Sequence, residues 1–199
     1  MVNNKFETVG ELFCGPGGGA IGASMSSCVA GSSTIRMKHL WATDYDNDSC
    51  ETYRKNISKF ESSELGFDSN LNIVSEDINS DSINLRDESQ FPYVDGLVFG
   101  FPCNDFSIVG ESKGLNGKFG PLFQHGITIL ERVSKPKWFI AENVGGLSSS
   151  NGGKALTKIL LKMKAAGYTV TPHKYKFEQY GIPQNRHRII IVGLRDDLK

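Results

Sequence analysis

Short apolar runs alternate with amphipathic stretches along nearly the whole chain of 199 residues. The apolar runs predict strands at Thr8–Phe13, Ile35–Thr43, Leu71–Ser75, Asp95–Phe99, Lys137–Glu142, Tyr168–Phe177 and Arg188–Leu194. Helices are predicted at Ala20–Val29, Asp46–Phe60 and Leu122–Val133, and around Leu156, Ile159, Leu160 and Met163, with Gly167 as a C-terminal cap. Such alternation predicts an α/β fold, with helices on both faces of an open, mostly parallel sheet. Because no helix separates the last two runs, one of those strands is expected to be antiparallel.

The length favours one domain. A chain of 199 residues can bury a sizeable α/β core but is short for two such domains, so we expect a single domain over residues 1–199. The stretch Ser148–Gly153 has the composition of a flexible loop but is too short to divide domains. Lys and Arg together number 22 and are balanced by 22 Asp and Glu, so only local clustering could create a basic patch for nucleic acid.

Several classes of protein and site are disfavoured. No apolar run approaches the roughly 20 residues that span a bilayer, and the N-terminus lacks the pattern of a signal peptide. We therefore expect a cytoplasmic protein with no membrane partner. The cysteines Cys14, Cys28, Cys50 and Cys103 have no CxxC spacing and no clustered histidines, so neither a metal site nor a disulfide is expected.

Glycine or polar clusters follow five of the predicted strands. They are Phe13–Gly19, Asp44, Glu76-Asp77, Gly100–Cys103 and Glu142-Asn143. The carboxyl ends of parallel strands meet at one edge of a sheet, and ligands of open α/β sheets bind beyond that edge. The sequence therefore predicts a ligand site built from these five clusters.

The first cluster indicates a cofactor of the adenosine type. Glycines in Phe13–Gly19 let the backbone approach a ligand closely and leave the following helix N-terminus facing it. Asp44 is placed to accept hydrogen bonds from ribose hydroxyls, and Asp77 from an adenine amino group. A tight turn and two helix caps are the alternative, but three suitable positions at successive strand ends favour the cofactor. The GxGxxG dinucleotide pattern is not matched, because Pro16 and Ala20 interrupt it.

Cys103 stands in a different setting from the other cysteines. A buried thiol is the common role of a cysteine, and it suits Cys28 and Cys50. Cys103 instead follows Pro102 in a glycine-containing loop after a strand, where a thiol of lowered pKa can act as a nucleophile. Glu142, at the end of the next strand, is the candidate partner carboxylate.

Together these motifs resemble those of the cytosine-C5 DNA methyltransferases. The matching pieces are Phe13–Gly18, Asp44–Asp46, Asp77-Ile78, Gly100–Cys103 with Phe106-Ser107, Glu142–Val144, and Gln184–Arg188. They follow the order and spacing of the family over essentially the whole chain. The resemblance implies a Rossmann-like methyltransferase fold, S-adenosyl-L-methionine as cofactor and double-stranded DNA as substrate. A prokaryotic or phage protein of a restriction-modification type is expected.

The resemblance also implies roles for single residues. Cys103 would add as thiolate to C6 of a flipped-out cytosine, Glu142 would contact N3 and the amino group, and Arg188 the base carbonyl. Arg186 is the other arginine of the same catalytic motif, and a loop from Asn104 to Gly120 would close over the base. The implied cofactor residues are Phe13, Gly15, Gly17, Gly18, Asp44, Tyr45, Asp77, Ile78 and Phe101.

Two departures from the family pattern stand out. Asn104 occupies a position where the family usually has glutamine, which affects contacts of the loop rather than the nucleophile. The sequence printed here also has no counterpart of the target-recognition domain, or of the returning helix that completes the cofactor site. We therefore expect a truncated protein, an isolated catalytic portion, or one subunit of a split enzyme whose second polypeptide carries the recognition domain.

Three functions other than DNA cytosine-C5 methylation are compatible with parts of the sequence. A tRNA cytosine-C5 methyltransferase of the same fold would carry a Cys-Phe-Thr signature, which does not occur in this sequence. A non-catalytic binding or regulatory remnant would fit the missing recognition half, but Cys103, Glu142 and Arg188 are all present. A nicotinamide-dependent oxidoreductase is disfavoured by the broken glycine pattern.

Overall fold

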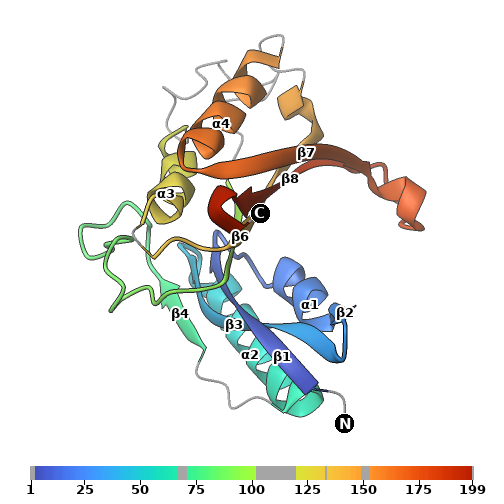
Figure 1. Cartoon of the computed structure of the whole chain (residues 1–199). Helices are drawn as coiled ribbons and strands as arrows, with labels where there is room; N and C mark the ends of the chain where they lie inside the picture. The colour runs from blue at the N-terminus through green and yellow to red at the C-terminus, as the bar shows by residue number, and fades with distance from the viewer. Residues whose placement is uncertain (1–2, 67–70, 102–119, 133, 149–152, 199) are drawn as a thin grey trace. The chain divides into compact units, whose positions relative to one another are not determined.

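The computed structural model describes residues 3–66, 71–101, 120–132, 134–148 and 153–198 (Figure 1). Contacts within the chain form two compact units, Met1–Val98 and Phe99–Lys199. The predicted nucleophile Cys103 and nearly all of the predicted loop Asn104–Gly120 lie outside the described residues. Within the described residues, no helix combines the length and the apolar character needed to cross a bilayer.

The strands of the N-terminal unit are arranged around β3 (Ser33–Asp44). β1 (Asn3–Leu12) pairs with β3 in parallel along its whole length, and β4 (Asn72–Ser75) pairs in parallel with the last four residues of β3. β2 (Ser27–Ala30) is antiparallel to the first four residues of β3. β5 (Gly96–Gly100) spans the boundary between the units. Because β1, β3 and β4 are parallel, their carboxyl ends lie at one edge of this sheet.

Two helices pack against β3 and against each other. α1 (Gly18–Met25) follows the glycine loop, and α2 (Asn47–Leu65) follows β3. The sequence favours Asp46 or Asn47 as the N-cap of this second helix, and the structure selects Asp46, whose side chain accepts a hydrogen bond from Ser49 N at 2.9 Å. The helices and sheet enclose a core of buried residues: Cys14, Ala20, Ala42, Tyr53 and Ile57.

The predicted helix Ala20–Val29 is wrong at its C-terminal end. α1 ends at Met25, and Ser26 adopts an extended conformation while its hydroxyl donates to Ala23 O at 2.7 Å. Serine hydroxyls compete in this way with helical hydrogen bonds. The next four residues form β2, whose backbone pairs with β3 through a turn at Gly31. Cys28 lies on β2 and is exposed, so our assignment of it as a buried thiol is also wrong.

The C-terminal unit contains β6 (Trp138–Val144), β7 (Tyr168–Lys176) and β8 (His187–Arg195). β8 is antiparallel to both of its neighbours, β6 and β7, which confirms the predicted antiparallel strand near the C-terminus. β7 therefore runs in the same direction as β6, and both end at the same edge. Pro172 lies in β7, an edge strand of this group, where a missing N–H donor is tolerated.

The helices of this unit are α3 (Gly120–Leu130) and α4 (Lys154–Ala165). α4 packs against β7 and against α3. The predicted cap is confirmed, because Gly167 follows the C-cap residue Ala166 of α4 with a left-handed φ of 89°. Three short 3₁₀ helices complete the described part of the unit: η2 (Gly145–Ser148), η4 (Phe177–Tyr180) and η5 (Asp196–Leu198).

Candidate functional site

The glycine loop of the N-terminal unit joins β1 to α1 through residues with left-handed backbone. Gly15 and Gly17 have φ values of 54° and 93°. Phe13 has a φ of 58° and is the sole non-glycine residue with positive φ in the described parts of the chain. Such a conformation costs on the order of 1–3 kcal/mol and is typical of functional sites, where the surrounding structure maintains it. The loop is therefore strained at the place predicted to receive the cofactor.

The carboxylate of Asp44 lies beside this loop. Its Oδ2 accepts a hydrogen bond from Gly15 N at 2.9 Å, and its Oδ1 accepts one from Asp46 N at 3.0 Å. Each carboxylate oxygen has a second lone pair, so both can still accept a hydroxyl. The structure thus ties Asp44 to the glycine loop and leaves it able to bind ribose hydroxyls. It does not cap α2, since Asp46 does so.

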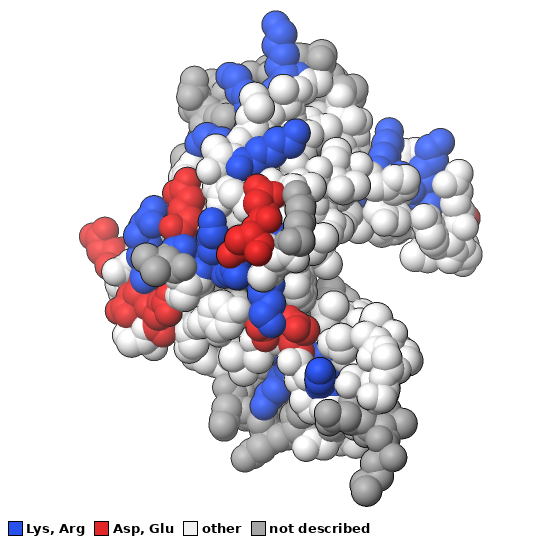
Figure 2. Space-filling view, in the orientation of Figure 1, with Lys and Arg blue, Asp and Glu red and all other residues white. Residues whose placement is uncertain are grey.

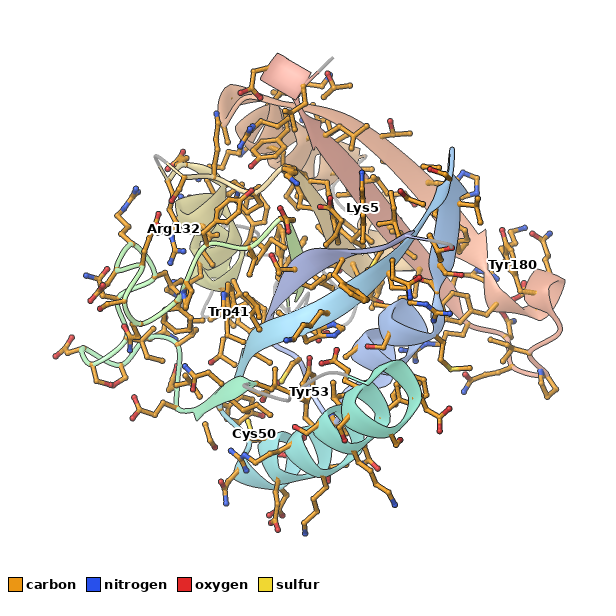
Figure 3. The ribbon with its side chains drawn as sticks, turned by 60° about the horizontal axis from the view of Figure 1, so that its bottom comes forward. Lys5, Trp41, Cys50, Tyr53, Arg132 and Tyr180 are labelled. Atoms are coloured by element: carbon orange, nitrogen blue, oxygen red, sulfur yellow. The ribbon has the colours of Figure 1, made fainter. Side chains whose placement is uncertain are left out.

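A buried pair, Glu11 and Tyr53, lies against the start of α1. Tyr53 donates its hydroxyl to Glu11 Oε2 at 2.9 Å, and Glu11 Oε1 is 3.3 Å from the position of a Cβ at Gly19. A Cβ at Gly17 would stand 3.0 Å from the Tyr53 ring, so glycine is required there. Tyr53 comes from α2 (Figure 3). Sequence reasoning missed this pair, although a glutamate inside the apolar run Thr8–Phe13 was a signal.

Burial raises the pKa of Glu11 to about 7. The charge interaction with His39 and the hydrogen bond from Tyr53 lower this pKa, but by less than burial raises it. Since the unfolded chain binds this proton less tightly, the proton stabilises the fold fully below about pH 4.5, and this contribution is lost as the pH rises through about 7. We expect the unfolding free energy of the wild type, relative to Glu11→Gln, to fall by about 2–3 kcal/mol between about pH 5 and pH 8. Urea denaturation at several pH values measures this difference, and a difference independent of pH would contradict the assignment.

The remaining cofactor candidates of the N-terminal unit follow β3 and β4. Tyr45 is exposed and Ile78 is buried. Asp77 Oδ1 accepts hydrogen bonds from the backbone and side-chain nitrogens of Asn79, both at 2.9 Å, which shapes the loop after β4. Phe101 belongs to the C-terminal unit, where it is buried with its ring centroid 5.1 Å from that of Phe123.

In the C-terminal unit, two predicted catalytic side chains form an ion pair. Arg188 Nε lies 2.6 Å from Glu142 Oε1, with the arginine side chain 17% and the glutamate 40% exposed. Both residues lie at the edge where β6 ends, because Val144 pairs with Arg188 across β6 and β8. Glu142 Oε2 is also 3.5 Å from the position of a Cβ at Gly100. Glu142 therefore lies beside the end of β5, from which the chain leads directly to Cys103.

Asn143 connects β6 to the same segment. Its Nδ2 donates to Phe101 O at 2.9 Å, and its Oδ1 accepts from Val144 N at 2.8 Å. The side chain is buried, and so is its hydrogen bond to Phe101. Asn143 thereby holds the backbone two residues before Cys103. The sequence alone identifies Asn143 as part of a motif but indicates no role of its own for this residue.

Residues 8–199 match the sequence profile of a family described as C-5 cytosine-specific DNA methylase. The chain belongs to this family. It is 47% identical over 193 residues to the type II methyltransferase M.BbvI of Brevibacillus brevis, covering 94% of this chain and 49% of that protein. It is 36% identical over 187 residues to the type II methyltransferase M.NgoFVII of Neisseria gonorrhoeae, covering 94% and 43%.

Solved structures of methyltransferases share the fold. A prophage-encoded protein of E. coli, described as a DNA modification methyltransferase, superimposes with a TM-score of 0.67 at 25% identity, covering 96% of this chain and 47% of its own. The Dnmt2 methyltransferase of S. pombe gives a TM-score of 0.66 at 19% identity, covering 96% and 50%. The predicted Rossmann-like methyltransferase fold is therefore confirmed. Enzymes of this family depend on S-adenosylmethionine, as predicted.

The methylase chain spans about half the length of these relatives.

None of the three cysteines that the structure describes is placed as the catalytic nucleophile: two are buried, and the third lies on the edge strand β2. Burial raises the pKa of the Cys14 thiol well above its usual range, Cys50 is buried as predicted, and Cys28 is on the edge strand β2. Within the described residues, no group of three or more His, Cys, Asp and Glu side chains is arranged to hold a metal ion. Arg186 is exposed in the segment before β8, and a catalytic role for it stays a prediction.

Proposed function

We propose that residues 1–199 act as the catalytic and cofactor-binding domain of a DNA cytosine-C5 methyltransferase. The Glu142–Arg188 pair, at the edge where β6 ends and beside the end of β5, is the observation that carries this proposal. Cytosine presents a carbonyl acceptor, the N3 acceptor and an amino donor along one edge. Arginine donates to the carbonyl, and a carboxyl group serves N3 and the amino group, so the pair is complementary to that edge.

The chemistry assigns one step to each side chain. The Cys103 thiolate forms a bond to C6, and the electron pair of the C5–C6 double bond shifts toward C4, so that negative charge develops at N3. Glu142 offsets the charge that develops at N3, while Arg188 binds the base carbonyl. S-adenosylmethionine, when bound, would supply the methyl group to C5 as its S–CH3 bond breaks, and would leave as the demethylated thioether. Loss of the C5 proton then restores the double bond and expels the Cys103 thiolate. Flipping the base out of the duplex costs a few kcal/mol, which contacts to the base edge offset.

The N-terminal unit fits the cofactor of this family. α1 starts at Gly18 after the left-handed N-cap Gly17, and no side chain caps it. Its first N–H groups are therefore suited to a carboxylate, such as the one that S-adenosylmethionine carries. Positions of a Cβ at Gly15 and Gly18 meet no atom within 4 Å, so backbone is accessible at both. Asp44 would hold the ribose hydroxyls and Asp77 the adenine amino group.

We also propose that a further polypeptide segment, carrying the target-recognition half, completes the enzyme. The matched relatives are about twice as long as the chain. Val192 and Leu194 on β8 are 40% and 55% exposed. They lie on one face with Ile140 and Trp138, their register partners in β6. A recognition half that packs on this face would remove the apolar side chains from water.

The chain alone is expected to leave DNA unmethylated, and the recognition half is expected to restore activity. Specific DNA interfaces bury on the order of 1,000–2,500 Å² and are strongly basic, which a chain with 22 basic and 22 acidic residues does not readily provide. The assay incubates unmethylated genomic DNA and S-adenosylmethionine with the purified chain, with or without the C-terminal half of M.BbvI, and detects C5-methylcytosine by mass spectrometry.

The same assay, repeated with tRNA in place of genomic DNA, tests both proposals. Sequence-specific C5-methylcytosine from the chain alone would show the second segment to be unnecessary. Methylated tRNA with unmethylated DNA would contradict the DNA substrate. At 19% identity, the likeness to Dnmt2 shows the fold alone and favours neither substrate. The bacterial and phage sources of the relatives support our prediction of a prokaryotic or phage origin, while the cytoplasmic location stays a prediction.

A further inference from the structure

Residues 173–188 form an arm that extends past the end of β6; we call it the β7–β8 arm. Val144, the last residue of β6, pairs with Arg188 of β8, which also pairs with Tyr175 of β7. One step further, His187 pairs with Lys176 of β7 and has no register partner in β6. η4 and the turn that returns to β8 follow (Figure 1). The arm therefore begins at the row that contains Glu142, where His173 pairs with Ile190, and continues beyond the end of β6.

The arm is basic although the chain is neutral. It carries Lys174, Lys176, Arg186 and Arg188 against a single carboxylate, Glu178. The three outer cations, Lys174, Lys176 and Arg186, are exposed, and Glu178 is bound by His187 Nε2 at 2.9 Å. In Figure 2 the arm, at the right of the view, shows Lys and Arg atoms and little acidic surface. Local clustering thus provides the basic patch that the overall composition does not.

Aromatic rings lie among these cations. The ring centroids of Tyr175 and Tyr180 are 5.7 Å apart, and those of His173 and Tyr175 are 4.7 Å apart. Tyr180, in η4, is 61% exposed (Figure 3). Exposed aromatic rings interleaved with Lys and Arg are typical of surfaces that bind nucleic acid. A partner with a dense array of phosphates fits both features better than an apolar protein surface does.

We propose that the β7–β8 arm binds the phosphate backbone of the duplex DNA substrate through Lys174 and Lys176, which alternate with Tyr175 and so project from one face of β7. This inference rests on the proposed function, because the arm adjoins Arg188 and Glu142 at the same sheet edge. A duplex whose cytosine reaches that pair extends over many phosphates and passes along the arm. Each phosphate that a cation neutralises releases counterions, so the arm makes binding depend steeply on salt.

The test compares two double variants of equal charge change. Lys174→Gln/Lys176→Gln removes the proposed contacts, and Lys154→Gln/Lys158→Gln removes two exposed lysines of α4 in the same unit. Fluorescence anisotropy measures the affinity of each full chain for a labelled DNA duplex across a range of salt concentrations. We expect the arm variant to lower the slope of log affinity against log salt by about 1.8, and to weaken binding at about 0.1 M salt by roughly tenfold or more. The α4 variant should behave as the wild type.

Three results would overturn the proposal: equal slopes for the arm variant and the wild type, no salt-dependent binding of the duplex by the wild type, or a loss that appears with tRNA but not with duplex DNA. Circular dichroism of both variants is the control for a retained fold. Binding is measured without methyl transfer, so a missing methylated product would contradict the proposed function but not DNA binding by the arm. An unchanged salt slope in a protein that does form C5-methylcytosine would contradict the role of the arm but not the proposed function.

Discussion

Cys103→Ser in the enzyme completed by its recognition half is expected to lower methyl transfer by about 10⁴-fold or more, the usual effect of removing a nucleophile. A serine hydroxyl is a far weaker nucleophile than a thiolate at neutral pH, so addition to C6 fails before any methyl group moves. Cofactor binding should persist, because the glycine loop and Asp44 belong to the N-terminal unit.

A DNA duplex that contains 5-fluorocytosine tests the covalent step directly. Fluorine cannot leave C5 as a proton does, so the bond between Cys103 and C6 persists and the adduct migrates as a larger species under denaturing electrophoresis. Cys28→Ser is the matched control, because Cys28 is an exposed thiol on β2 that we place in no site. An adduct that survives in Cys103→Ser, or disappears in Cys28→Ser, would contradict the assignment.

Glu61→Ala is expected to destabilise the chain by about 3–5 kcal/mol, because it leaves several buried hydrogen-bond donors without an acceptor and opens a cavity. Glu61 Oε1 accepts hydrogen bonds from His39 N and His39 Nδ1, both at 2.9 Å, and from the Ser24 hydroxyl at 3.2 Å. All three residues are buried. Alanine would leave these donors without an acceptor and open a cavity where α2 meets β3 and α1.

Such a loss is a large part of the 5–15 kcal/mol by which domains are usually stable, so the variant should melt at a much lower temperature. Glu61→Gln keeps a carbonyl acceptor and should lose less. The control is Glu51→Ala on the same helix, since Glu51 and Lys55 form an exposed pair that adds little to stability. Urea denaturation measures all three, and a Glu61→Ala chain as stable as Glu51→Ala would refute the role of the buried pair.

Much of the fold follows from local patterns. Strand and helix periods predicted every described strand except β2, and they predicted the four α-helices, with shifts of a few residues at the ends. The hairpin of β2 and β3 was missed because Ser27–Ala30 has no strong strand pattern of its own. Its conformation comes from backbone pairing with Ser33–Arg36, a contact that neither segment specifies alone.

The candidate site was predictable as a set of residues, but not as a set of contacts. Glycines and carboxylates after apolar runs identify the ligand edge from sequence, because parallel strands end together. The 2.6 Å contact of Glu142 with Arg188 exists only because β6 and β8 pair antiparallel in one register. A shift by one residue would turn Arg188 to the opposite face of the sheet.

Sequence by itself thus determined the α/β elements other than β2, the helix cap Gly167, and the sheet edge that carries the motifs. Each depends on the preferences of residues that are neighbours along the chain. Tertiary structure alone decided which buried polar groups meet: Glu11 with Tyr53, Glu61 with His39, and Asn143 with the backbone of Phe101. These partners are 22 to 42 residues apart. Only a closed core forces each donor to find the one acceptor that burial leaves within reach.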